Sequence, residues 1–344
     1  MKTPRYQAIQ IAFTYMGTIV GAGFATGQEI LQFFTKYGYI ATYTIAIATI
    51  LFVWLGYKLM LLSYYISAKS YEDLNKAILG ERLGKWVSHF MLIILLGVSS
   101  VMLAGAGTIF HEHWDLSYQL GLILTGAACY LLLQKGMNAI LAVNSIVVPF
   151  MLLFTLFVIL KTSQLPTSAQ FISLETGKSF WSALASPFLY VAFNLALAQA
   201  VLVPLGSQVA DTKAIRRGAI LGGIGIGFML IAGHFALSAN MPDIAQYSIP
   251  MGGIAKQFGF IIQTAYIFII FSEIFTTLIA DIYGLTLQLH SRIQWSKPLL
   301  LFAALVACYF ISQIGFQILL STLYPIFGFI SLIWLIQLFR QKTI

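Results

Sequence analysis

Two groups of residues in this chain could carry chemistry inside apolar surroundings. Gly17, Gly21, Gly23 and Gly27 are four glycines in eleven positions of one apolar stretch, and Glu273 stands in the middle of another. Glycine permits backbone geometries that other residues resist, so a helix can unwind there and present free amides and carbonyls. Free amides favour an anionic group and free carbonyls a cation. The alternative is close helix packing through small residues.

Glu273 is followed one turn later by two hydroxyl residues, Thr276 and Thr277. This spacing places three oxygen-bearing side chains on adjoining parts of one helical face. An ionisable residue at membrane depth is a functional hypothesis, and this set suits a hard cation or a proton relay. In the alternative, a protonated glutamate bonds to another helix and the threonines bond to their own backbone.

Weaker candidates lie towards the ends of apolar stretches. Glu29 falls in the outer part of the first stretch and could face an aqueous vestibule. The His-Glu-His run at 111–113 has a metal-compatible spacing, but a solvated loop is the favoured interpretation. His234 and Asp281 lie near the ends of their stretches, where an interfacial position explains them.

Composition excludes a soluble protein. Hydrophobic residues make up 59% of the 344 residues and charged residues 9%, against about a quarter charged in soluble domains. Mean hydropathy is +0.88. The net charge of +8 does not indicate a nucleic-acid partner, because membrane topology explains the basic residues. Cys129 and Cys308 lie in apolar runs, so neither a disulfide framework nor a cysteine metal site is indicated.

The hydropathy pattern predicts one transmembrane domain, 1–344, with ten spans. They are 7–35, 40–66, 86–110, 117–134, 137–160, 179–204, 215–238, 254–288, 298–315 and 317–338. Of the 19 lysines and arginines, fourteen fall on the side of the termini and four on the other, and Lys58 lies inside the second span. Because cytoplasmic loops retain positive charge, we expect a bacterial inner-membrane protein with both termini in the cytoplasm.

A sequence motif that occurs twice predicts a duplicated architecture. The pattern Ala-Cys-Tyr-x-x-x-Gln-x-Gly occurs at 128–136 and again at 307–315, unless the match is coincidental. It divides the chain into two repeats of five spans, about 7–160 and 179–338, and an odd number per half makes the second repeat inverted. The sixth span should then contain a break matching that of the first, around Pro187 and 190–194, although a simple proline kink is an equal alternative.

The motifs resemble a known family. The segment 20–29, Val-Gly-Ala-Gly-Phe-Ala-Thr-Gly-Gln-Glu, is similar to the signature of the YkvI family of bacterial membrane proteins, and this resemblance runs the whole chain. That family is grouped with the amino acid-polyamine-cation (APC) transporter superfamily. Two shorter segments, 17–23 and 273–277, resemble the first-helix break and the eighth-helix sodium-site stretch of LeuT-type transporters.

The resemblance implies a fold and a set of site residues. The fold is an all-α polytopic one with ten transmembrane helices in a LeuT-like 5+5 inverted repeat, with helices 1 and 6 broken. A sodium ion would be held by the carbonyls of Gly17, Val20 and Glu273 and the hydroxyls of Thr276 and Thr277. A substrate carboxylate would meet the amides around Gly21, Ala22, Gly23 and Phe24, flanked by Phe193 and Asn194, with Ser99 as a selectivity candidate.

Two departures leave the coupling ion open. Sodium sites of this type usually carry a small neutral residue where Glu273 stands, so a proton could replace or supplement the metal. Proton-coupled relatives often have a lysine in the fifth span, where this chain has Asn144 and Ser145.

The sequence therefore predicts a cation-coupled symporter of a small solute, an amino acid or related amine, working by alternating access. Its expected partners are the solute, Na⁺ or H⁺ and the lipid bilayer, with no cofactor beyond a sodium ion and no nucleic acid; the sequence gives no oligomeric state. The alternatives are a solute sensor on a transporter scaffold and, less favoured, a membrane-embedded enzyme. No catalytic set is evident among the eleven acidic and five histidine residues.

Overall fold

The computed structural model consists of helices connected by short loops. It describes residues 4–68, 70–134, 138–209, 211–290 and 292–341, without the side chains of 4, 5 and 138–148. The α-helices are α1 (Pro4–Ile19), α2 (Ala22–Ala25), α3 (Gln28–Phe33), α4 (Ile40–Ile66), α5 (Tyr71–Trp114), α6 (Tyr118–Leu133), α7 (Asn138–Thr162), α8 (Gln170–Ser173), α9 (Phe180–Gln208), α10 (Thr212–Ala239), α11 (Pro250–Lys256), α12 (Phe260–His290), α13 (Lys297–Ser312) and α14 (Phe316–Arg340). Short 3₁₀ helices are η1 (Thr35–Tyr37), η2 (Pro166–Ala169) and η3 (Asp243–Gln246).

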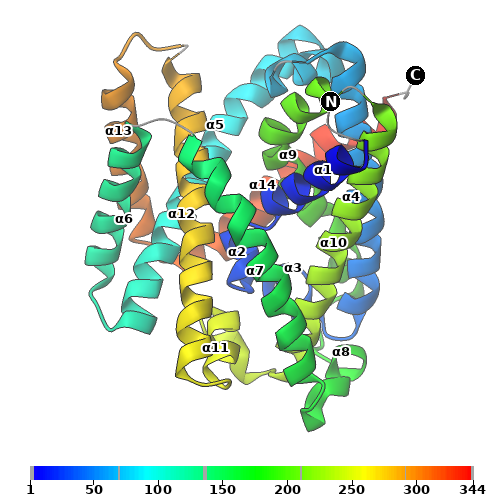
Figure 1. Cartoon of the computed structure of the whole chain (residues 1–344), viewed down its shortest axis with the longest axis vertical. Coiled ribbons are helices and arrows are strands. Elements are labelled where there is room, and N and C mark those ends of the chain that lie inside the picture. Colours follow the sequence, from blue (N-terminus) through cyan, green and yellow to red (C-terminus); the bar gives the residue numbers. More distant parts are fainter. Residues whose placement is uncertain (1–3, 69, 135–137, 210, 291, 342–344) are drawn as a thin grey trace.

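Each of the ten predicted spans corresponds to a helix or a helix group. Among the described residues, α4, α5, α9, α10, α12 and α14 are long and apolar enough to cross a membrane unaided. The other four are the interrupted first span (α1 to α3), α7, and the 16-residue apolar helices α6 and α13. The beginning of α1 and the end of α14 lie at the same, upper end of Figure 1, as an even number of spans requires.

The break in the first span is confirmed. Gly21 is extended, with φ −93° and ψ −171°, and separates α1 from α2. A second interruption follows at Gly27, whose φ of +83° lies in the left-handed region that favours glycine. A side chain there would also collide with Met251, since a Cβ on Gly27 would lie 2.6 Å from its Cγ. The first span is therefore three helical pieces.

The matching break in the sixth span is absent, and that prediction was wrong. α9 runs from Phe180 to Gln208 with Pro187 and Pro204 inside it. The reason is compositional: a proline removes one backbone donor and bends a helix, whereas unwinding is easiest at glycine. The first glycine in this stretch is Gly206, in the last turn of α9.

Two predicted span limits also move at glycines. α5 begins at Tyr71, well before the predicted 86, and bends at Gly80, whose φ is +78°. The predicted span 254–288 is divided into α11 and α12, with Gly259 at φ +97° between them. In both cases a left-handed glycine changes the chain direction next to a continuous apolar run.

The helices form two groups, and the predicted repeat exchanges helices within each group (Figure 1). One group contains α1, α4, α9 and α10; the other contains α5, α6, α12 and α13. The contact of α1 with α10 has its counterpart in that of α9 with α4, and α5 with α6 has its counterpart in α12 with α13. α7 contacts α10 and α12, as α14 contacts α4 and α5. This is the contact pattern of a 5+5 pseudo-twofold arrangement; the residue limits of the two repeats stay a prediction.

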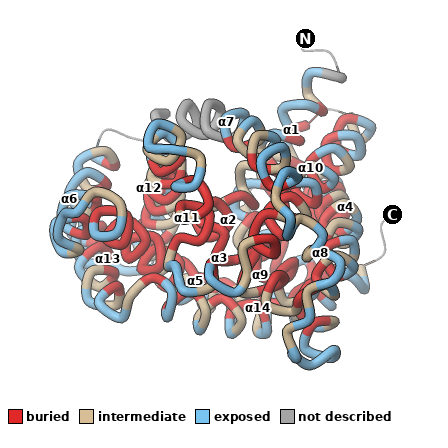
Figure 2. The backbone as a smooth tube through the Cα atoms, turned by 90° about the horizontal axis from the view of Figure 1, so that it is seen from below, coloured by how far each residue is buried: buried red, intermediate tan, exposed pale blue. Residues whose placement is uncertain are grey.

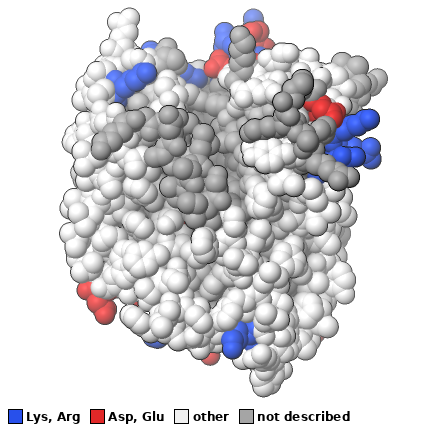
Figure 3. Space-filling model, viewed as in Figure 1, with Lys and Arg blue, Asp and Glu red and all other residues white. Residues whose placement is uncertain are grey.

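The surface is that of a protein embedded in lipid. Buried residues lie at the centre of the bundle around α2, α3 and α9 and exposed ones at its rim (Figure 2). On the face in Figure 3, charged side chains gather at the two ends, and the belt between them is uncharged. Large apolar side chains are exposed on the spans, such as Phe329 of α14, which is 69% exposed. A bilayer provides the apolar surroundings that such a belt requires.

Glycines bring helices of the first group into backbone contact. A Cβ on Gly206 of α9 would lie 2.5 Å from the Met60 carbonyl oxygen of α4, and a Cβ on Gly223 of α10 would lie 2.8 Å from the Val53 backbone of α4. Without a strong hydrophobic driving force between helices in lipid, such close approach is a main source of association.

We therefore expect Gly206→Ala to destabilise the protein by about 1–3 kcal/mol, because its new methyl group meets backbone that cannot move aside. Gly126→Ala is the matched control: it lies in α6, and no atom comes within 4 Å of its added Cβ. Thermal unfolding of both purified variants measures the difference. Equal melting temperatures would show that this contact does not limit stability.

Candidate functional site

The interrupted first span is held by hydrogen bonds from distant parts of the chain. The Met251 amide of α11 donates to the Thr26 carbonyl at 2.9 Å, and the Tyr266 hydroxyl of α12 donates to the Ala25 carbonyl at 2.7 Å. The Gln28 side-chain amide donates to the Tyr247 carbonyl at 2.9 Å. Carbonyls that the breaks free between α2 and α3 are thus satisfied by donors of α11 and α12, and the loop before α11 accepts a hydrogen bond from Gln28 of α3.

The first break itself leaves backbone groups open. The Gly21 amide donates to the Ile19 carbonyl at 2.9 Å, not to the Gly17 carbonyl that a continuous helix would use. In the described backbone, the amides of Ala22, Gly23 and Phe24 make no bond back to α1. Free carbonyls on one side and free amides on the other are the groups that such breaks offer to ions and polar solutes.

α12 places its polar residues opposite this break. Glu273 is 2% exposed, and its Oε1 has no hydrogen-bond partner among the described residues. Thr276 is buried, and its hydroxyl donates to the Glu273 carbonyl at 3.2 Å. The Thr277 hydroxyl faces the break, since it lies 3.7 Å from where a Cβ on Gly21 would be. The structure thus brings two of the predicted segments together.

These residues fit a hard cation by donor type. The predicted set consists of oxygen donors alone: carbonyls of Gly17, Val20 and Glu273 and the two threonine hydroxyls. The break supplies the first two and α12 the others, with Gly21 and Thr277 adjacent. Among the described residues no group of three His, Cys, Asp or Glu side chains is arranged for a transition metal.

A second polar centre surrounds Glu29 of α3. This side chain is 4% exposed and folds back over α2, where its carboxyl fills the space that a Cβ on Gly23 would need. The Tyr190 hydroxyl of α9 faces the carboxyl, and Tyr324 of α14 lies within electrostatic range. Neither the Tyr190 hydroxyl nor Glu29 Oε2 meets hydrogen-bond geometry with any described residue. A buried hydroxyl beside a buried carboxyl, with neither oxygen satisfied within hydrogen-bond geometry, is costly, which makes this place a candidate site.

The remaining substrate candidates have mixed surroundings. Asn194 is buried, and its amide donates to the Tyr190 carbonyl at 3.0 Å, one turn back. The Phe193 ring packs against Tyr324 of α14, with ring centroids 4.4 Å apart. Ser99 of α5 is fully buried and its hydroxyl has no partner among the described residues. The substrate roles of these residues, and of buried Ala22 and Phe24, stay predictions.

Three residues of this interior were missed by the interpretation of the sequence. Asp281 was assigned to an interface, but its Oδ2 is buried without a described partner. It lies eight residues after Glu273, on the face that includes Thr277, and this spacing was the available signal. Tyr190 and Tyr324 gave no signal, because tyrosines are common in apolar spans and only the fold places them around Glu29. Asn144 and Ser145 lie outside the residues whose side chains are described.

The chain is similar to two proteins of Bacillus subtilis (strain 168). No protein-family model matches the chain. The chain is 39% identical over 346 residues to the uncharacterized membrane protein YkvI of Bacillus subtilis (strain 168), an alignment covering 100% of this chain and 98% of that protein. It is 24% identical over 326 residues to the uncharacterized protein YyaD of the same organism, covering 94% and 93%.

Among solved structures, the inward facing conformation of Mhp1 matches with a TM-score of 0.63 and 14% identity. The match covers 94% of this chain and 73% of that one. At this identity the likeness concerns the fold, which is of the LeuT type. The all-helical fold expected from the motifs is thereby confirmed, apart from the continuous sixth helix.

The unpartnered hydroxyl at the Glu29 centre gives a stability test. We expect Tyr190→Phe to change the melting temperature little, because the Tyr190 hydroxyl faces the Glu29 carboxyl without meeting hydrogen-bond geometry, so little is lost with it. Tyr15→Phe is the control: Tyr15 is equally buried, but its hydroxyl donates to the Phe52 carbonyl at 2.8 Å. That variant should lose about 1 kcal/mol. If both variants were destabilised alike, the Tyr190 hydroxyl would have to be bonded in the native protein.

Proposed function

The chain belongs to the YkvI family of membrane proteins. We propose that it is a secondary active transporter of a small solute, driven by a cation gradient. The LeuT-type fold supports this class, because inverted repeats with a discontinuous helix are a recurring plan of secondary transporters. In this proposal the molecule alternates access around the first-helix break.

One observation carries the proposal: half-buried Thr277 faces the break at Gly21, one turn after buried Glu273 and next to buried Thr276 on α12. Open backbone and a buried carboxyl are tolerated at membrane depth where they bind something. In a protein whose helices only packed together, neither group would be retained without a partner.

We propose that the coupling cation binds between these two segments. For sodium, the ligands are the carbonyls of Gly17, Val20 and Glu273 and the hydroxyls of Thr276 and Thr277. For a proton, the carrier is the Glu273 carboxyl, with Glu29 as a second carboxyl in reach of the break. An unpaired buried carboxylate is unfavourable in a low-dielectric interior, so each of these groups must take up a proton or a cation.

The solute is an amino acid or a related amine in this proposal. The free amides of Ala22, Gly23 and Phe24 suit a carboxylate group. Glu29 lies beside them and suits the amino group, because a buried carboxylate favours a cationic partner. Ser99, Phe193 and Asn194 are the candidates for contacts with the rest of the solute.

The proposed location is the bacterial inner membrane, with both termini in the cytoplasm. The excess of lysine and arginine on the side of the termini supports this orientation. Figure 3 agrees, since its upper end carries more basic side chains than its lower end.

The Glu273 role predicts that Glu273→Gln abolishes concentrative uptake while the protein stays folded, since the amide cannot exchange a proton or carry charge. Uptake of labelled amino acids into proteoliposomes, with an imposed sodium or pH gradient, measures this. The control is Glu81→Gln, an exposed glutamate whose side chain is 71% accessible. Full coupling in Glu273→Gln would exclude this residue from the mechanism.

Sodium coupling and proton coupling lead to different predictions for the thermal stability of the purified protein. A ligand that binds the native state raises its stability in proportion to the logarithm of ligand concentration. The sodium site would be supported by stabilisation that requires sodium and is absent in potassium. The affinity for sodium should then fall about tenfold or more in the Thr276→Ala, Thr277→Ala double variant. Ser272→Ala is the control, because its hydroxyl bonds to the Phe268 carbonyl on the exposed side of α12. Stabilisation that follows pH alone would assign coupling to the carboxyls.

A further inference from the structure

A polar pocket lies outside the central site, at the end of the molecule opposite the termini. It is formed where α11 meets the end of α5 and the beginning of α12 (Figure 1), and has a volume of about 450 Å³. Its lining is Glu112, His113, Gln246, Tyr247, Gly252, Gly253, Lys256 and Gln263. Ligand pockets of small molecules begin at about 300 Å³, so a compact solute fits.

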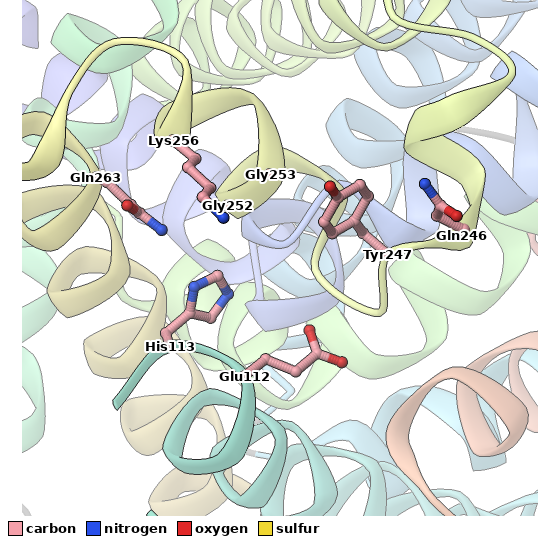
Figure 4. Close-up of a pocket in the computed structure, with 8 residues that line it drawn as sticks. All are labelled: Glu112, His113, Gln246, Tyr247, Gly252, Gly253, Lys256 and Gln263. Carbon is pink, nitrogen blue, oxygen red and sulfur yellow. The ribbon is translucent and has the colours of Figure 1, made fainter. Parts of the chain in front are cut away.

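The pocket carries one charge of each sign. Figure 4 shows Lys256 and His113 turned towards each other across the pocket, with Glu112 and Tyr247 beside them. Neither Lys256 nor Glu112 has an ion-pair partner within the described part of the chain. The two therefore line one hollow without neutralising each other.

His113 adds another polar group. It lies in the last turn of α5, after the predicted span 86–110, and is partly buried where it lines the pocket with Lys256. Its Nε2 is buried and has no hydrogen-bond partner among the described residues. Gly252 makes room for the ring, since a Cβ there would lie 3.0 Å from Nε2. The pocket thus offers a basic side chain, an acidic side chain and an imidazole nitrogen without a partner among the described residues.

We propose that this pocket is a second binding site, specific for a small zwitterion of the amino-acid type. The carboxylate of the ligand pairs with Lys256 and its ammonium group with Glu112. A simple anion would pair with Lys256 and leave Glu112 without a partner, and a simple cation would do the reverse. A zwitterion pairs with both side chains. This inference goes beyond the central site, and binding here does not require transport.

The position of the pocket gives the ligand a mechanical consequence. Lys256 is the last residue of α11, whose Met251 amide bonds to Thr26, and Tyr247 accepts from Gln28. A ligand that pairs with both Lys256 and Glu112 bridges α11 and the end of α5. It thereby favours the arrangement in which α11 covers the interrupted first span.

Calorimetric titration of the purified full-length protein tests the proposal. The probes are glycine, L-alanine and L-serine, compared with propionate and ethylamine, which each keep one charge of alanine. We expect at least one zwitterion to bind roughly tenfold or more tightly than either single-charge analogue, because each lost contact is a charge-assisted hydrogen bond. Propionate binding as tightly as alanine would overturn the zwitterion specificity.

Variants assign the binding to this pocket. Lys256→Met and Glu112→Gln should each weaken zwitterion binding roughly tenfold. Lys178→Met and Glu175→Gln are the matched controls, because both residues are exposed in the loop before α9 and do not line the pocket. In the Glu273→Gln background, binding here should persist although uptake is expected to be lost, which separates this site from the transport proposal. Binding that is insensitive to Lys256 and Glu112, or no binding of any zwitterion, would overturn the proposal.

Discussion

A backbone group without a hydrogen-bond partner is far more costly in the hydrocarbon interior than at a wet surface. The arrangement of this protein follows from the need to give partners to the backbone amides and carbonyls of the broken first helix. The break exposes groups of α1 and α2 that lipid could not satisfy. They are therefore placed at the centre of the bundle, where α11 and α12 supply donors to Thr26 and Ala25. Groups at Gly21 that stay open face the polar residues of α12. The other helices thus enclose the broken first helix and supply partners to its backbone.

The same constraint explains why two centres of polarity lie so close together. Glu273 opposes the break from α12, and Glu29 folds back over α2 from α3. Both carboxyls are buried, and each has an oxygen without a partner among the described residues. In water such groups would be ordinary; in this interior they bind a proton or a cation, or they destabilise the fold. Protein chains retain such groups mainly where binding makes use of them, and here that binding is proposed to be coupled transport.

The end of the molecule opposite the termini has a different character. There α11 joins the interrupted helix on one side and a polar pocket on the other, so one short helix of seven residues connects the two places. The Met251 amide donates a hydrogen bond to the Thr26 carbonyl, and Gly252, Gly253 and Lys256 line the pocket. Because α11 contacts both places, a ligand in the pocket can favour one position of α11 against the interrupted helix.

The sequence by itself determined the all-helical membrane class, the positions of the ten apolar spans and the break at Gly21, because hydropathy and glycine act locally in the chain. It also made Glu273 and its threonines candidates for the site, since a carboxyl in an apolar run is visible without a fold. Tertiary structure alone decided which spans meet. It showed that α9 is continuous, that Tyr190 and Tyr324 surround Glu29, and that Asp281 is turned inwards. These depend on which helix faces pack together, and no local pattern of residues specifies that choice.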